Sequence, residues 1–182
     1  GNLIGILFDE SFDGSSYREV VFSPTGVAQL RQVNARTIEV LESAPHSVGS
    51  NTWFDVTLSV SSFGVSVNIN GNHLFSHEVP LLSGLPETLA LITHWTPGRF
   101  DDFEFGPHEL PVPESLQTFN SPLGEGEVRS GTWNTQGGML NNVSAGVADI
   151  VLPGQISAST DFRYKGRLLN QYGASGNLVG LV

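Results

Sequence analysis

Two adjacent carboxylates, Asp101 and Asp102, are the residues of this sequence best suited to chemistry. They lie in the segment FDDFEF, whose mixture of aromatic and acidic residues predicts a β-strand. In a regular strand Asp101 shares a face with Phe103 and Phe105, so its carboxylate is expected to point toward the edge of the core. A bare charge is costly there, so a partner must hold it, and loop N–H groups or Arg99 would serve.

A tryptophan in a loop is the second candidate. Trp95 lies in the segment HWTPG, among residues that favour loops. The face of an indole ring can stack on the apolar face of a pyranose, while amides and carboxylates bind the sugar hydroxyls. Trp95 and His94 therefore form the predicted ligand-binding pair, with packing as the alternative role for the ring. Trp53 and Trp133 stand at the starts of predicted strands, where packing at the edge of the core is expected.

Short strands are the elements that must position these residues. The stretch from Trp53 to Phe75 alternates apolar and polar residues twice, which predicts two strands of one β-hairpin that share a buried face. The apolar positions are Phe54, Val56, Leu58, Val60, Phe63, Val65, Val67 and Ile69. Asn70 and Gly71 follow and predict a tight turn, because both residues tolerate positive φ.

Composition and charge exclude several classes of function. The 182 residues include 21 Gly, 10 Pro and no Cys, a composition that favours many short strands joined by turns. A formal net charge of −10 would be repelled by nucleic acid and by anionic membrane surfaces, so we expect neither as a partner. No apolar run is long enough to insert across a membrane, and the absence of cysteine excludes thiol chemistry and a disulfide framework.

The chain divides into two blocks around a proline-rich segment. The sequence GPHELPVPE has three prolines in nine residues, so we expect a linker over 107–115, between blocks 1–106 and 116–182. The last seven residues, GNLVGLV (176–182), echo the first seven, GNLIGIL (1–7), with four identities and three aliphatic exchanges. Both ends therefore look cut from something longer, as expected for one period of a tandem array.

The motifs of the two blocks resemble the laminin-G-like, concanavalin A-like jelly-roll superfamily in permuted order. The second block is similar to the start of such a module through GTW, GGML, DFRY and GNLVGLV. The first block is similar to the remainder through GNLIGILF, YREVVF, the central hairpin and FDDF. The resemblance implies an all-β, antiparallel jelly-roll sandwich with circularly permuted strands. On this interpretation 1–106 is the C-terminal part of one module and 116–182 is the N-terminal part of the next. A self-closing permutant and a different topology are the alternatives.

The resemblance also implies a site. In related jelly rolls an Asp at the position of Asp101 binds a structural Ca²⁺ with backbone carbonyls and an acidic residue near the first strand. Calcium suits such a place because it accepts six to eight oxygens in a loose geometry. Here Asn120 stands where the acidic partner is expected, so Asp101 and Asn120 are the predicted metal residues. Glycosidases of this fold carry E-x-D-x-E or E-x-D-x-x-E on one strand. That pattern is absent, and we expect no enzyme.

Two functions follow as expectations. The first is a non-enzymatic repeat module of an extracellular or cell-surface protein, a structural scaffold or adhesin that shares strands with neighbouring copies in a filament. The alternative is a carbohydrate-binding, lectin-like module that binds glycans, with calcium as its implied cofactor. The two differ in what they require, because a scaffold needs complementary strand ends and a lectin needs exposed rings on a face.

Overall fold

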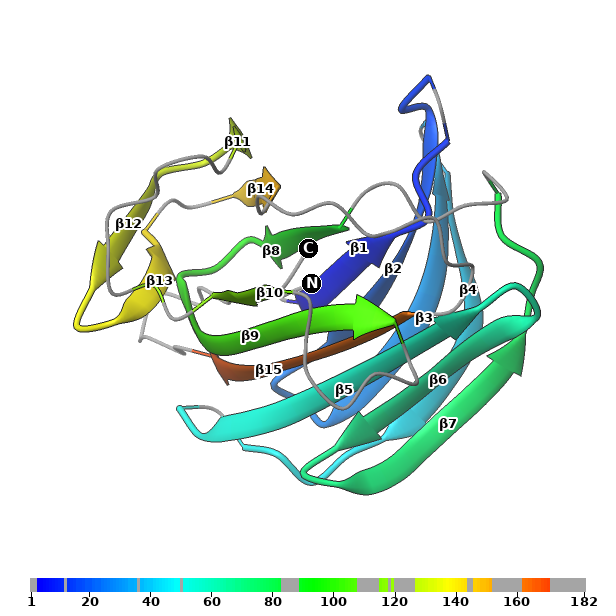
Figure 1. The fold of residues 1–182 in the computed structure, drawn as a ribbon, viewed down its shortest axis with the longest axis horizontal. Helices are drawn as coiled ribbons and strands as arrows, with labels where there is room; N and C mark the ends of the chain where they lie inside the picture. The colour runs from blue at the N-terminus through cyan, green and yellow to red at the C-terminus, as the bar shows by residue number, and fades with distance from the viewer. Residues whose placement is uncertain are drawn as a thin grey trace.

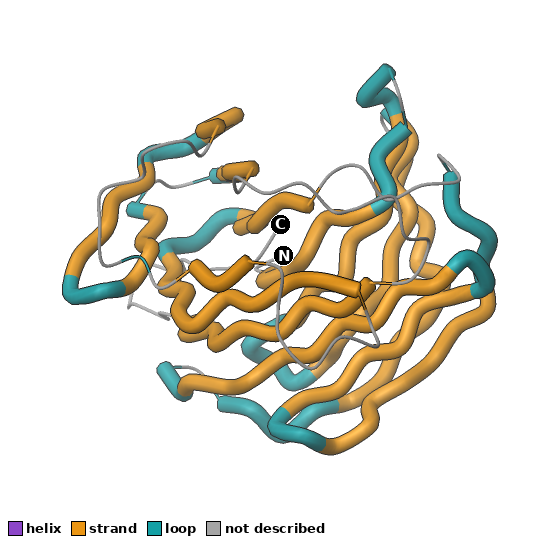
Figure 2. The backbone as a smooth tube through the Cα atoms, viewed as in Figure 1, coloured by secondary structure: helices purple, strands orange, loops and turns teal. Residues whose placement is uncertain are grey.

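A computed structural model gives the fold. It describes residues 3–11, 13–35, 37–49, 51–82, 89–107, 115–117, 119, 127–143, 146–151 and 162–170. These residues form fifteen strands and no helix (Figures 1 and 2). In chain order the strands are β1 (Leu3–Phe8), β2 (Ser16–Phe22), β3 (Val27–Asn34), β4 (Thr37–Pro45), β5 (Trp53–Ser61), β6 (Gly64–Ile69), β7 (Asn72–Glu78), β8 (Leu89–His94), β9 (Gly98–Pro107), β10 (Ser115–Gln117), β11 (Glu127–Ser130), β12 (Trp133–Gln136), β13 (Met139–Asn142), β14 (Val147–Val151) and β15 (Phe162–Asn170).

The strands make two antiparallel sheets that pack as a sandwich, which confirms the predicted all-β, antiparallel β-sandwich. The circular permutation of its strands stays a prediction. The first sheet has the order β11-β14-β8-β1-β2-β3-β4. The second has the order β12-β13-β9-β15-β5-β6-β7, with β10 paired to β9. Among the described residues we find no helix that could span a membrane.

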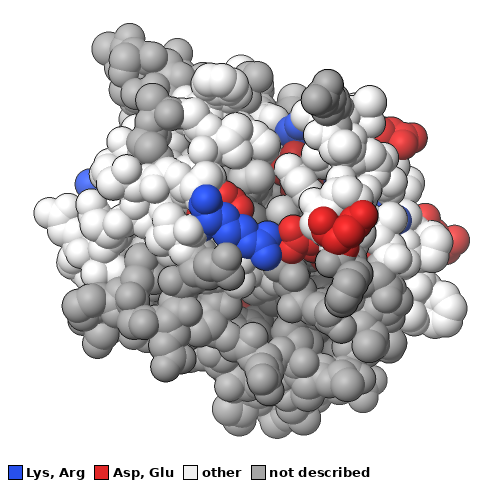
Figure 3. All heavy atoms as spheres, turned by 90° about the horizontal axis from the view of Figure 1, so that it is seen from above, with Lys and Arg blue, Asp and Glu red and all other residues white. Residues whose placement is uncertain are grey.

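Strands from both sides of the proline-rich segment share both sheets. In the second sheet β15 lies between β9 and β5, and in the first sheet β11 and β14 continue the sheet beyond β8. Arg129 of β11 also reaches the segment after β1, where its Nη1 lies 3.0 Å from both carboxylate oxygens of Glu10. Figure 3 shows basic atoms near the centre of one face directly against acidic ones. The described strands thus build one sandwich, while the assignment of the blocks to successive modules stays a prediction.

The core lies between the two sheets and receives apolar side chains from both. The largest fully buried side chains are Phe8, Phe22, Phe100, Ile6, Leu30, Leu58, Leu91 and Leu140. The alternation predicted for the central hairpin explains its share of the core, because the buried residues of β5 and β6 occupy every second position. Phe63 is the exception. It lies in the turn between these strands, and 82% of its surface is exposed.

The turn after β6 has the geometry that its residues predict. Asn70 and Gly71 have φ values of 51° and 76°, in the left-handed region that Asn and Gly tolerate. Asn70 also ties the turn to β5 in two ways. Its N–H donates to the carbonyl of Asp55 at 2.9 Å, and its side-chain oxygen accepts the N–H of Asp55 at 2.9 Å. This double contact fixes the start of β5 against the end of the hairpin.

Candidate functional site

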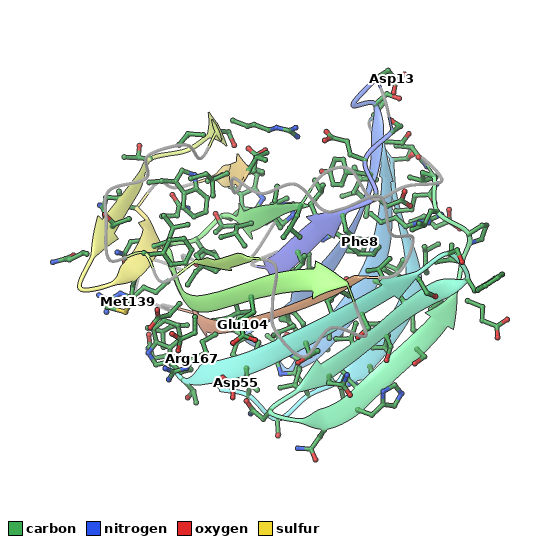
Figure 4. The ribbon with its side chains drawn as sticks, in the orientation of Figure 1. Phe8, Asp13, Asp55, Glu104, Met139 and Arg167 are labelled. Carbon is green, nitrogen blue, oxygen red and sulfur yellow. The ribbon has the colours of Figure 1, made fainter. Side chains whose placement is uncertain are left out.

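A hollow opens on the outer face of the second sheet, the face turned away from the core. Its volume is about 540 Å³, and β5, β9, β15 and the turn after β6 form its walls. We call it the Trp53 hollow. Its lining residues are Trp53, Phe54, Asp55, Asn70, Asp102, Glu104, Gly166 and Arg167. Figure 4 shows Asp55, Glu104 and Arg167 near one another at one end of this sheet.

The alternation of β5 and β15 brings three of these side chains to the outer face. Phe54 is buried in the core, so its neighbours Trp53 and Asp55 point outward. Arg167 points outward for the same reason, because the next residue, Leu168, is buried. Arg167 and Asp55 are also direct partners in the register of β15 and β5. Neighbouring strands therefore place an aromatic ring, an acid and a base side by side.

A β-bulge in β9 adds Asp102 to the hollow. The register between β15 and β9 shifts between Lys165 and Arg167, and Asp102 has a φ of 53°. Before the bulge, Phe100 is buried and Asp101 pairs with Arg167, so Asp101 lies on the outer face. The expectation that Asp101 points toward the edge of the core is therefore wrong. Strict alternation along FDDFEF does not hold, because the bulge inserts one residue into the strand.

Arg167 is the centre of charge in the hollow. Its Nε lies 3.6 Å from Asp55 Oδ1, and its Nη1 lies 3.4 Å from Asp102 Oδ2. Its guanidinium carbon lies 5.4 Å from the centroid of the Trp53 ring, within the range of a cation–π contact. These contacts hold an exposed arginine between two carboxylates. With Asp55, Asp102 and Glu104 against one arginine, the lining is acidic.

Asp101, the predicted calcium ligand, lies beside these residues. Burial raises the pKa of its carboxyl, and the neighbouring charge of Asp102 adds to the increase. Its Oδ1 accepts the N–H of Asp102 at 2.9 Å. Asn120, the other predicted ligand, lies outside the described residues. Within the described part of the chain, no three His, Cys, Asp or Glu side chains gather to hold a metal ion. These residues provide no complete ligand set, and calcium stays a prediction.

The structure places Trp95 and His94 at the end of β8, in the first sheet, and so apart from the Trp53 hollow. Trp95 is 59% exposed, and its backbone N–H donates to the carbonyl of Gly146, in the loop before β14, at 2.7 Å. His94 is mostly buried, and its Nε2 lies 3.0 Å from a carboxylate oxygen of Glu19, a fully buried residue. The two predicted residues therefore diverge, one toward solvent and the other toward a buried acid.

The other two tryptophans differ from each other. Trp133 packs against the core as expected, with its ring 5.8 Å from that of Phe100 and its Nε1 donating to the carbonyl of Ser130 at 2.8 Å. Trp53 is half-buried and contributes to the hollow instead of the core. The sequence contained one indication that Trp53 lies on the outer face. Trp53 and Asp55 share the polar side of the predicted hairpin, and that side faces solvent in a two-layer sandwich.

The lining of the hollow is suited to binding. The Trp53 ring offers an apolar face, and Asp55, Asn70 and Glu104 offer oxygens and an amide that can bond to hydroxyl groups. Arg167 adds a guanidinium, which remains charged and can donate hydrogen bonds to an acceptor oxygen. An aromatic platform ringed by polar groups is the arrangement by which proteins bind sugars and other polyols.

Comparison with known proteins shows no match to a protein-family model and no curated protein of significant sequence similarity.

Proposed function

We propose that this chain is a non-enzymatic module of an extracellular or cell-surface protein and that it binds carbohydrate in the Trp53 hollow, as an adhesin would. The observation that supports the proposal most is the cluster of Trp53, Arg167, Asp55 and Asp102 on the outer face of the second sheet. The arginine is already held in the free protein. Binding of a ligand to the cluster therefore costs little side-chain entropy, because the arginine is ordered before the ligand arrives.

The negative charge of the hollow limits the kinds of glycan that can bind. The hollow and the whole chain are acidic, so an anionic glycan would be repelled. A neutral sugar satisfies the same groups, because its hydroxyls donate to carboxylates and accept from arginine and amide groups. The proposed ligand is therefore a neutral glycan.

Trp53→Ala is expected to weaken glycan binding at least about tenfold, since an aromatic anchor at the centre of a site supplies more than about 1.4 kcal/mol. The measurement is a glycan microarray with linear, branched and terminal sugars, followed by titration calorimetry on the sugars retained. Trp53 does not pack on the core cluster, so the variant should unfold at the temperature of the parent chain.

Trp95→Ala is the matched control, because it removes an exposed tryptophan on the other sheet. It should bind like the parent. Loss of binding in Trp95→Ala with normal binding in Trp53→Ala would move the site to the loop after β8. An array on which no sugar is retained would refute the proposal.

A structural role is a second proposal, in which the chain is one unit of a tandem array or filament. β4 favours it. This nine-residue strand ends the first sheet, and its side chains Ile38 and Val40 are 56% and 48% exposed. An exposed edge with apolar residues is a template for pairing with another chain. β1, by contrast, is paired on both sides with β2 and β8, so sharing this strand between copies would require an exchange.

Ile38→Lys is expected to reduce self-association, because a charge on an edge strand opposes pairing. The measurement is mass by light scattering over a range of concentrations, then negative-stain imaging, each with and without a calcium chelator. Assemblies that the variant loses would support the array, and their loss in chelator would support a structural calcium ion. A parent chain that is monomeric at every concentration would refute the filament.

A further inference from the structure

A second hollow lies at the opposite end of β5 on the same sheet. Its volume is about 370 Å³. It is lined by Ser59, Val60, Ser61, Phe63, Gly64, Val65, Ser66, Ser76, His77 and Glu78. Phe63 is the most exposed large apolar residue of the described chain, at 82%. The sequence pattern predicted this ring in the core. The structure shows instead that it lies on a turn and faces solvent.

The surface between the two hollows is a floor of small polar side chains. Ser59, Ser66 and Ser76 are direct partners across β5, β6 and β7, and the next pair toward the Trp53 hollow is Thr57 with Asn68. All five lie on the outer face, because the residues on either side of them in β5 and β6 are buried, as is Phe75 beside Ser76 in β7. In the described part of the chain their side chains make no hydrogen bond. Their hydroxyl and amide groups can donate to and accept from the hydroxyls of a ligand on this face.

The form of this surface excludes a peptide strand as its natural occupant. β5 and β6 are each paired on both sides, so their backbone groups are already bonded within the sheet. An added peptide strand needs free backbone groups at a sheet edge. A ligand lying on this face must instead be recognised by side-chain hydroxyls, amides and rings, and these are the groups that bind the hydroxyls and apolar faces of sugars.

We propose that the chain binds an unbranched, neutral glycan laid along β5, from Trp53 at one end to Phe63 at the other. This inference rests on the proposed function and specifies its ligand. The strand from Trp53 to Ser61 spans roughly 27 Å at about 3.3 Å per residue, which is room for several linked sugar rings. The two aromatic rings hold the two ends of the glycan, and the row of serines bonds to the hydroxyls between them.

The test is the dependence of affinity on ligand length. The probes are cello-oligosaccharides and N-acetylated chito-oligosaccharides of two to six units, measured by titration calorimetry with the full chain. Affinity is expected to rise with each added unit. Phe63→Ala should weaken the hexasaccharides about three- to tenfold, as expected for one aromatic contact, and leave the disaccharides unchanged. Trp53→Ala should weaken every length.

Ile38→Ala is the matched control, because it removes an exposed apolar side chain from the other sheet. It should bind every oligosaccharide like the parent. Equal affinity for short and long probes, or no effect of Phe63→Ala on the hexasaccharides, would overturn the extended site while leaving the Trp53 hollow in place. Retention of branched or terminal sugars on the array without binding to either linear series would also overturn it, and the proposed function would stand.

Discussion

Asp9→Asn is expected to lower the free energy of unfolding by about 3–5 kcal/mol, the cost of breaking a buried ion pair by removing one charge. Asp9 is fully buried, and its carboxylate accepts a hydrogen bond of 2.7 Å from Arg18, which is itself 3% exposed. Both carboxylate oxygens also accept the N–H of Leu82, at 2.8 and 2.7 Å. The NH₂ group of an asparagine here would face either the Arg18 guanidinium or the Leu82 N–H, which are both donors. The guanidinium would also lose its counter-charge.

Replacement by asparagine removes the charge of Asp9 without disturbing the backbone. Asp9 has a φ of 58°, which asparagine tolerates well, so Asp9→Asn adds little strain of its own. The measurement is urea unfolding followed by fluorescence. Asp13→Asn is the control, because Asp13 is exposed at the tip of the loop after β1 (Figure 4) and accepts hydrogen bonds from the neighbouring Ser11 and Ser15. It should change stability far less. Equal effects of the two substitutions would show that the Asp9 pair does not stabilise the fold.

Leu168→Ala is expected to destabilise the whole chain by about 2–5 kcal/mol, the usual cost of truncating a buried leucine. Leu168 is fully buried in β15, where it pairs with Phe54 of β5 and Phe100 of β9. Because β15 lies between strands from the first block, the loss should appear in every part of the sandwich. Far-ultraviolet circular dichroism and tryptophan fluorescence should report one common transition at a lower urea concentration.

Val143→Ala serves as the control for Leu168→Ala, since it truncates a residue of the same block that is 55% exposed. It should leave the transition nearly unchanged. If Leu168→Ala shifted one spectroscopic transition and left another in place, the two blocks would be folding separately. That result would favour the assignment of 1–106 and 116–182 to different modules over closure of the chain on itself.

Local pattern predicted the strands well where one face is apolar. The alternation in β5 and β6 placed seven of the eight expected core residues correctly, because a side chain that alternates along a strand must alternate between core and solvent. It failed at Phe63, where the chain leaves the strand to turn. It failed again at Asp101, where a bulge shifts the alternation by one residue. A turn boundary and a bulge depend on the partner strand, which no single segment contains.

The candidate site was harder to predict than the fold. Trp95 and His94 are neighbours in sequence, yet their side chains have different surroundings in the sandwich. Trp53 and Arg167 are far apart in sequence and meet because β15 enters the sheet beside β5. A site on an outer sheet face is built from side chains that lie side by side on several neighbouring strands. Its membership is set by strand order and register, and spacing along the chain does not reveal either.

The sequence by itself determined that this protein is built of short strands joined by turns, because the alternation of apolar residues and the choice of turn residues act locally. Only the tertiary structure decided that β15 lies between β5 and β9, that Arg167 stands over Trp53 between two carboxylates, and that Phe63 faces solvent. The physical reason is the separation along the chain of the residues that interact. Strand formation depends on residues a few positions apart, whereas the hollow depends on pairings that bring together residues more than a hundred positions apart.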